Sequence, residues 1–264
     1  MRTIHRVLDP DTPAEMFSGC CALALMTKAP RAGEVKTRLV PPLTSDEAAQ
    51  LNRCFLQDTS AAISVCCSSG PPVPNPGRPI AFGIAVYTPI GAESDYTDIL
   101  PVDFSLLPQR GPKFGERLCF AAEDLFKCGF GAVCLIDSDS PTIPANNFTR
   151  AVELLSLPED RIVLGPCDDG GYYLIGLKRL HREIFQGIDW STERVFEQTK
   201  RRAKQIRLGV RELPHGFDVD DRAALHRLCD ELLGENARDN VAPQTKKFLR
   251  ELVARDGRGR VWPS

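Results

Sequence analysis

The chain has 264 residues, of which 42% are hydrophobic and 26% are charged, and its formal net charge is −2. A near-neutral balance gives no general attraction to nucleic acid or to an anionic membrane surface. Since no apolar run approaches the roughly 18 residues of a membrane span and no secretory signal precedes Cys20, we expect a cytoplasmic protein.

The ten cysteines and four histidines show neither a disulfide framework nor a zinc site. No C-x-x-C pair occurs, the histidines are scattered, and Cys134 lies inside an apolar run. We therefore expect reduced, buried cysteines.

In chain order, polar residues 1–18 predict a flexible N-terminal arm. The apolar run 21–26 predicts a buried parallel strand, and 44–63 predicts a helix opened by the capping box of Thr44 and Glu47. Proline and glycine mark 68–81 as a loop or insertion. Later strands are expected at 84–88, 132–136, 161–165, 172–177 and 207–213, and later helices at 115–127, 146–155, 191–204, 221–233 and 243–254.

Strands and helices alternate along the chain, which predicts an α/β fold: a three-layer α/β/α sandwich around a mostly parallel sheet. No internal boundary is evident, so we expect one domain over 19–255 and a C-terminal tail over 256–264. Ligands of such sheets bind outside the carboxyl ends of the strands. The unusual polar clusters of this chain begin where apolar strands stop.

The first such cluster is a basic loop at 28–39, directly after the first strand. It carries four basic residues and one acid, and Gly33 permits close approach of the backbone. Backbone N–H groups together with lysine and arginine heads are what a polyphosphate needs. The alternative is a solvated surface loop.

Two acidic clusters follow other strands. Asp137 and Asp139 come directly after the strand 132–136, and a second group spans 218–221. Mg²⁺ or Mn²⁺ prefers carboxylate oxygens together with substrate phosphates, so Asp139 with Asp218 or Asp220 predicts a metal site. The alternatives are an Asx-turn and a helix cap, the latter being the role expected of Asp221.

A glycine turn joins the strands 161–165 and 172–177. Gly170 and Gly171 allow positive φ and close approach to a ligand, and Asp169 could orient an acceptor or act as a general base. A tight hairpin turn without a function is the alternative.

Together these clusters resemble the DUF2064 family, which is related to 2-phospholactate guanylyltransferase and molybdenum-cofactor guanylyltransferase. The resemblance covers about residues 20–233. It rests on motifs in the same order: K-A-P-x-x-G-x-V-K-T-R-L at 28–39, G-E-R-L at 115–118, S-D-S-P at 138–141, G-P-C-D-D-G-G-Y-Y-L-I-G-L at 165–177, W-S-T-E at 190–193 and D-V-D-D at 218–221. The sequence departs from the family pattern at Asp137, where glycine is usual, and at Asp221, where threonine is common.

The resemblance implies a nucleotide-diphospho-sugar transferase fold of the GT-A type and assigns roles to particular residues. The expected nucleotide-binding residues are Lys28, Gly33, Lys36, Arg38, Glu116 and Arg117. Asp139 and Asp220 would hold Mg²⁺ or Mn²⁺. The acceptor would meet Asp169, Gly170 and Gly171, and the expected catalytic residues are Lys36 and Asp169.

Three functions fit this pattern. The first is a nucleotidyltransferase that moves a nucleotidyl group from an NTP to a small phosphorylated acceptor. The loop Lys36-Thr37-Arg38 narrowly favours this function over the other two. The second is a glycosyltransferase with an NDP-sugar donor, and the third a non-catalytic nucleotide-binding protein. The expected partners are therefore a nucleotide or nucleotide-sugar and a small-molecule acceptor, with no nucleic acid and no membrane.

Overall fold

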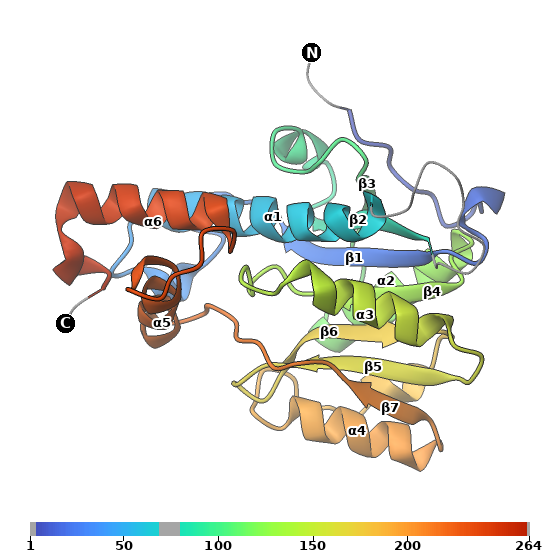
Figure 1. Cartoon of the computed structure of the whole chain (residues 1–264). Helices are drawn as coiled ribbons and strands as arrows, with labels where there is room; N and C mark the ends of the chain where they lie inside the picture. Colours follow the sequence, from blue (N-terminus) through green and yellow to red (C-terminus); the bar gives the residue numbers. More distant parts are fainter. Residues whose placement is uncertain (1–3, 69–79, 263–264) are drawn as a thin grey trace.

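A seven-stranded sheet forms the centre of the molecule (Figure 1), in a computed structural model that describes residues 4–68 and 80–262. Its strands lie in the order β3-β2-β1-β4-β6-β5-β7, and within the described chain β6 alone runs antiparallel to its neighbours. The expected mostly parallel sheet is confirmed. The strands are β1 (Cys21–Lys28), β2 (Ala81–Thr88), β3 (Ser105–Pro108), β4 (Ala132–Ile136), β5 (Arg161–Pro166), β6 (Tyr172–Leu177) and β7 (Gly209–Glu212).

Helices cover both faces of this sheet, which confirms the three-layer sandwich. Leu23 and Leu25 of β1 pack on the side of α1 and α3, whereas Ala22 and Ala24 pack on the side of α2. Burial on both faces explains why β1 is a continuous apolar run rather than an alternating one. The helices are α1 (Ser45–Ser68), α2 (Phe114–Lys127), α3 (Ala145–Ser156), α4 (Val195–Gln205), α5 (Arg222–Leu233) and α6 (Pro243–Asp256).

A separate apolar cluster joins α5 and α6 to the first half of α1, beyond the end of the sheet (Figure 1). Asp221 caps α5 as expected, because its side chain accepts a hydrogen bond from the Ala224 N–H. None of the helices in the described part of the chain is long and apolar enough to cross a membrane. The cysteines are buried, apart from half-buried Cys67.

The N-terminal stretch, expected to be a flexible arm, packs against the sheet in its described part. The Leu8 N–H donates to the Leu106 carbonyl at 2.8 Å, and the Leu106 N–H donates to the Arg6 carbonyl at the same distance. Leu8 and Phe17 are buried. Pairing with β3, a four-residue strand that the sequence did not predict, fixes this stretch.

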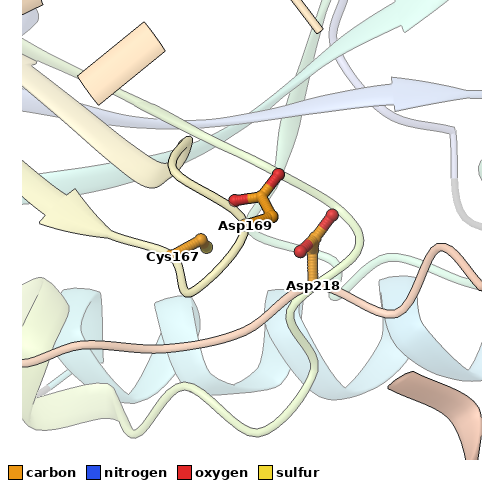
Figure 2. A group of neighbouring side chains, drawn as sticks. All are labelled: Cys167, Asp169 and Asp218. Atoms are coloured by element: carbon orange, nitrogen blue, oxygen red, sulfur yellow. The ribbon is translucent and has the colours of Figure 1, made fainter. Parts of the chain in front are cut away.

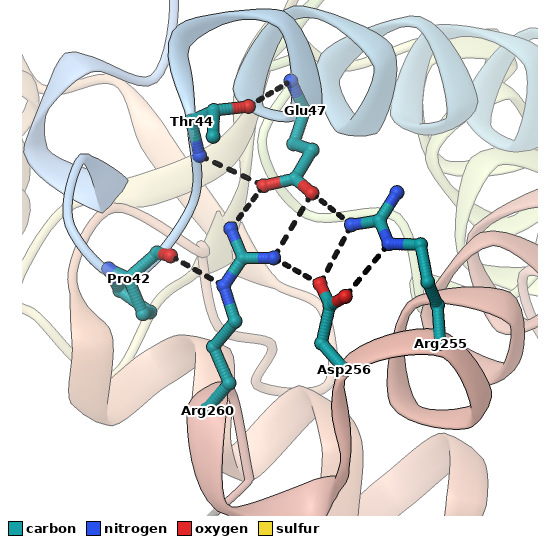
Figure 3. A network of polar contacts seen from close by, with 6 residues as sticks. All are labelled: Pro42, Thr44, Glu47, Arg255, Asp256 and Arg260. Carbon is teal, nitrogen blue, oxygen red and sulfur yellow. Dashed lines mark hydrogen bonds and ion pairs between the residues drawn. The ribbon is translucent and has the colours of Figure 1, made fainter.

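The C-terminal tail is also fixed, by a charged network at the start of α1 (Figure 3). Glu47 forms the expected capping box with Thr44 and accepts hydrogen bonds from Arg255 and Arg260. Arg260 Nε also donates to the Pro42 carbonyl at 3.0 Å. Burial alone would raise the pKa of Glu47, but the bonds from Arg260, the Thr44 N–H and Arg255 lower it to about 2. The network thus anchors the segment that follows the basic loop.

Two other expectations change. The helix expected from Ser191 begins only at Val195, because Ser191 has a left-handed φ of 64° and lies in the preceding turn. The proline-rich insertion expected at 68–81 falls almost entirely outside the described residues, and β2 begins at Ala81.

Candidate functional site

The basic loop leaves β1 at Lys28 and ends in a short 3-10 helix (Thr37–Leu39). Gly33 has φ +76° with open space where a Cβ would lie, so its backbone conformation rather than crowding favours glycine. Lys36 has φ +48°, which is uncommon for a residue with a side chain. This left-handed turn directs Lys36 away from solvent.

Lys36 bridges the two carboxylates that were expected to hold a metal. Its Nζ lies 2.7 Å from Asp139 Oδ1 and 2.8 Å from Asp220 Oδ1, and it donates to the Val219 carbonyl at 2.8 Å. The lysine side chain is only 4% exposed. Burial lowers its pKa, but the negative charges of Asp139 and Asp220 outweigh burial and raise the pKa above its usual value. Lys36 is therefore a charged ammonium with its three donors used.

The acidic segments meet because their backbones are bonded to each other. Asp139 follows β4, and its carbonyl accepts a hydrogen bond from the Val219 N–H at 2.9 Å. The segment before Val219 pairs with the glycine turn, where the Asp168 N–H donates to the Gly216 carbonyl at 3.2 Å. Three segments far apart in sequence are thus held at one rim of the sheet.

The glycine turn supplies the next carboxylate. Asp169 Oδ1 accepts a hydrogen bond from the Gly171 N–H at 2.8 Å. Gly170 has φ +86°, and a Cβ there would lie 2.1 Å from the Glu193 carbonyl oxygen. Only glycine lets the loop before α4 approach this turn so closely. The turn connects the antiparallel strands β5 and β6, as expected for a hairpin turn. It also places Asp169 at the rim of the sheet.

Asp169 and Asp218 are neighbours beside Cys167, and ligand atoms of the three lie within 4.8 Å of one another (Figure 2). Burial, followed by the charge of Asp137, raises the pKa of the Cys167 thiol, so it stays protonated and is a poor ligand for a hard cation. Burial and the neighbouring Asp169 and Asp220 raise the pKa of Asp218 to about 6. Such crowding of carboxylates favours the arrival of a cation.

Oxygen donors of this kind fit Mg²⁺ or Mn²⁺. Asp139 and Asp220 are 34% and 45% exposed, so a cation can reach both from solvent. Asp137, where the family has glycine, adds a carboxyl group held by the Ser140 hydroxyl at 2.7 Å. Burial, then the charge of Asp139, raises the pKa of Asp137 well above its usual value, which favours the neutral acid at this position.

Three adjoining cavities open around these groups, and Arg38 and Asp220 line all of them. The cavity at the basic loop measures about 260 Å³ and includes Lys28, Lys36 and Asp139. A cavity of about 550 Å³ extends over the sheet rim past Asp169, and one of about 400 Å³ lies toward α5. Within the described chain the Arg38 guanidinium forms no hydrogen bond or ion pair, so it is available to a ligand.

Glu116 and Arg117 are not brought to these cavities. Arg117 instead donates from Nε to the Gly111 carbonyl and from a terminal nitrogen to the Pro112 carbonyl, both at 3.2 Å. The residue of this motif that matters to the site is Gly115, because a Cβ there would lie 2.3 Å from Trp190 Nε1. Binding of nucleotide by Glu116 and Arg117 stays a prediction.

The aromatic part of the site was missed by sequence reasoning. Trp190 closes over Gly115, and its ring meets Phe114 edge-to-face at 5.3 Å between centroids. Both aromatic residues line the 550 Å³ cavity. The only signal in the sequence was that the G-E-R-L and W-S-T-E motifs occur together.

With this geometry in hand, comparison with solved structures defines the class. The chain is similar to a candidate nucleotide-diphospho-sugar transferase from Desulfovibrio desulfuricans G20, at 29% identity and a TM-score of 0.75 over 90% of this chain and 96% of that one. It also shares its fold with a CMP:2-keto-3-deoxy-manno-octonic acid synthetase complexed with CTP, at 10% identity and a TM-score of 0.50 over 82% and 99% of the chains. Both structures confirm the expected GT-A-type fold. The first of them also confirms the class of transferase.

The family follows. Residues 82–192 match the DUF2064 family, described as an uncharacterized protein conserved in bacteria, which confirms the resemblance read from the motifs. The relation to the two guanylyltransferases stays a prediction. No curated protein matches the sequence.

Proposed function

We propose that this chain is a metal-dependent transferase that moves a group from a nucleotide donor, an NTP or an NDP-sugar, to a small acceptor. The observation that carries the proposal is the meeting of Lys36 with Asp139 and Asp220 at 2.7 and 2.8 Å, beside a guanidinium of Arg38 that has no partner in the described chain. Opposite charges at one rim are what a complex of metal and polyphosphate needs.

The cavity at the basic loop is the proposed place of the donor's phosphates. Arg38 binds them directly, and Lys28 lies at the edge, where its amine is 3.4 Å from the exposed Glu34 carboxylate. Asp139 and Asp220 would hold Mg²⁺ or Mn²⁺, which would supply positive charge next to the departing phosphate. The chain's own contribution is positioning and fixed charge.

Lys36 has two roles in this proposal. Without a nucleotide it neutralises Asp139 and Asp220 and keeps the rim folded. With a metal bound, Asp139 and Asp220 would serve as its ligands, and the Lys36 ammonium would be free to bind the donor's phosphates. Asp169, which is exposed and held by the Gly171 N–H, orients the acceptor and takes its proton.

Thermal unfolding with each common NTP and NDP-sugar, with and without Mg²⁺ or Mn²⁺, tests the proposal. A nucleotide at about 100 times its Kd adds roughly 2.7 kcal/mol of stability. We expect metal-dependent stabilisation that Arg38→Gln abolishes. Arg31→Gln is the matched control, because Arg31 belongs to the same loop but pairs with Asp95, outside the cavities.

The donor class decides between the two transfer reactions. Stabilisation by NDP-sugars favours glycosyl transfer, which the name of the 29% identical neighbour also supports. Stabilisation by NTPs alone favours nucleotidyl transfer. Stabilisation without turnover would leave a nucleotide-binding protein, and no stabilisation by any nucleotide would contradict the proposal.

A further inference from the structure

The 550 Å³ cavity is lined by two unlike kinds of side chain. One kind is apolar or aromatic and includes Phe114, Leu118, Tyr172 and Trp190. The other kind is acidic, with six carboxyl groups from Asp137, Asp139, Asp169, Glu193, Asp218 and Asp220. Arg38 is the single basic residue among the described residues that line it, and Arg38 belongs to the donor loop.

This charge distribution disfavours a phosphorylated acceptor. A bound phosphate needs lysine or arginine groups or several backbone N–H donors directed at it. Asp139 and Asp220 are paired with Lys36, but Asp169, Glu193 and Asp218 have no basic partner in the described chain. These three carboxylates together repel a phosphate dianion. Even a divalent cation at Asp139 and Asp220 is expected to be engaged with the donor's phosphates.

The aromatic residues of this lining are held in place by packing. Trp190 is half-buried and rests on Gly115, where any side chain would displace it. Phe114 meets it edge-to-face but stays 53% exposed at the cavity. An exposed aromatic ring braced by a tryptophan offers an apolar surface to a ligand.

We propose, on the basis of the transferase function above, that the acceptor is an unphosphorylated alcohol with an apolar or aromatic group. Its apolar part lies on Phe114 and Trp190, and its hydroxyl faces Asp169. In the transfer the acceptor oxygen bonds to the transferred group, and the bond from that group to the donor's phosphate oxygen breaks, leaving its electron pair on the nucleotide phosphate. The hydroxyl proton passes to the Asp169 carboxylate.

This acceptor class departs from the phosphorylated acceptor expected from the sequence. The sequence expectation rested on the loop at Lys36 and Arg38, and these residues belong to the donor side of the rim. Of the two, only Arg38 also lines the 550 Å³ cavity, together with six carboxyl groups. The inference therefore favours glycosyl transfer to a hydroxyl over nucleotidyl transfer to a phosphate.

Tryptophan fluorescence measures this binding, because the chain has two tryptophans and one lines the cavity. A Trp262→Phe variant leaves Trp190 as the reporter. The probes are phenyl β-D-glucopyranoside and 2-phenylethanol, and each is compared with its own phosphate monoester. All are titrated with and without Mg²⁺ and the nucleotide that stabilises the protein. Calorimetry on the wild-type chain gives the same comparison if Trp262→Phe is unstable.

We expect at least one alcohol to bind at least about tenfold more tightly than its phosphate ester. Methyl β-D-glucopyranoside should bind more weakly than the phenyl compound. Trp190→Ala, measured by calorimetry because it lacks the fluorescent reporter, should remove that difference. Asp218→Asn should narrow the gap between alcohol and phosphate ester, since it removes a charge without changing shape. A merely structural role of Asp218 would change both affinities alike.

Equal or tighter binding of the phosphate esters overturns the acceptor class. So does failure of every probe to bind while nucleotide stabilisation is intact. If no nucleotide stabilises the protein, the proposed function itself fails, and the two failures are thereby distinguished.

Discussion

Replacing Lys36 by methionine perturbs the centre of the proposed site, because the change removes the positive charge and nearly preserves the shape of the side chain. The lysine is 4% exposed, whereas its partners Asp139 and Asp220 are 34% and 45% exposed. The triad thus lies between a surface ion pair, worth at most about 1 kcal/mol, and a buried one, which costs about 3–5 kcal/mol to break. We expect Lys36→Met to lower the free energy of unfolding by about 2 kcal/mol.

The same variant should bind divalent metal more tightly in the absence of nucleotide. An ammonium and a divalent ion about 4 Å apart repel each other by about 2 kcal/mol even at the dielectric constant of water. Removing Lys36 should therefore tighten Mn²⁺ binding by at least about tenfold, measured by isothermal titration calorimetry. Nucleotide affinity should fall in the same protein, because the donor's phosphates lose a cation.

Lys28→Met is the matched control, since Lys28 belongs to the same loop but pairs with the exposed Glu34. It should change metal affinity by less than about twofold, as befits a screened surface charge. Unchanged or weaker Mn²⁺ binding in Lys36→Met would refute the idea that lysine and metal compete for Asp139 and Asp220.

Three further changes test other parts of the structure. In thermal unfolding, Asp139→Asn should abolish the metal-dependent stabilisation by nucleotide. Asp168→Asn should retain it, because Asp168 pairs with Arg227 rather than with Lys36. Equal metal dependence in the two variants would count against the metal site. Gly170→Ala should lose most transferase activity because its Cβ has no room, while Gly91→Ala, with a similar φ of +90° and open space, should cost only about 1–2 kcal/mol of stability and keep activity. Glu47 has a pKa of about 2 in the fold against 4.5 ordinarily, so the stability it provides is present above pH 4.5 and lost as the pH falls toward 2. Urea unfolding at pH 7 should accordingly show Glu47→Gln to be about 2 kcal/mol less stable than wild type, after allowance for the exposure of the arginine partners. This difference in stability should shrink below pH 4. A difference that stays constant with pH would exclude the ion pairs as its cause.

Local signals predicted much of the fold. The apolar run 132–136 and the stretch 172–177 coincide with β4 and β6, and Asp221 caps α5 as expected. The strand-end rule likewise placed Lys36, Asp139 and Asp220 at one rim, where the structure brings them together. These features depend on patterns within a few residues or on a general property of parallel sheets.

Other features depend on contacts between distant residues and had no local signal. Strand β3 has only four residues and forms because β2 and the N-terminal stretch pair with it. The packing of Trp190 on Gly115 joins two motifs whose relation cannot be read from either. That Lys36 would lie between the carboxylates, rather than face solvent beside them, depends on its left-handed backbone. Such side-chain positions follow from the assembled fold alone.

The most direct test of the account is a crystal structure grown with Mn²⁺ and whichever NTP or NDP-sugar stabilises the protein, with the anomalous signal of manganese recorded. The proposed function predicts manganese bound to the carboxylates of Asp139 and Asp220, phosphates within hydrogen-bond distance of Arg38, and a Lys36 amine that has turned toward them. Manganese and phosphates bound away from this rim, with the lysine still between its two carboxylates, would contradict it.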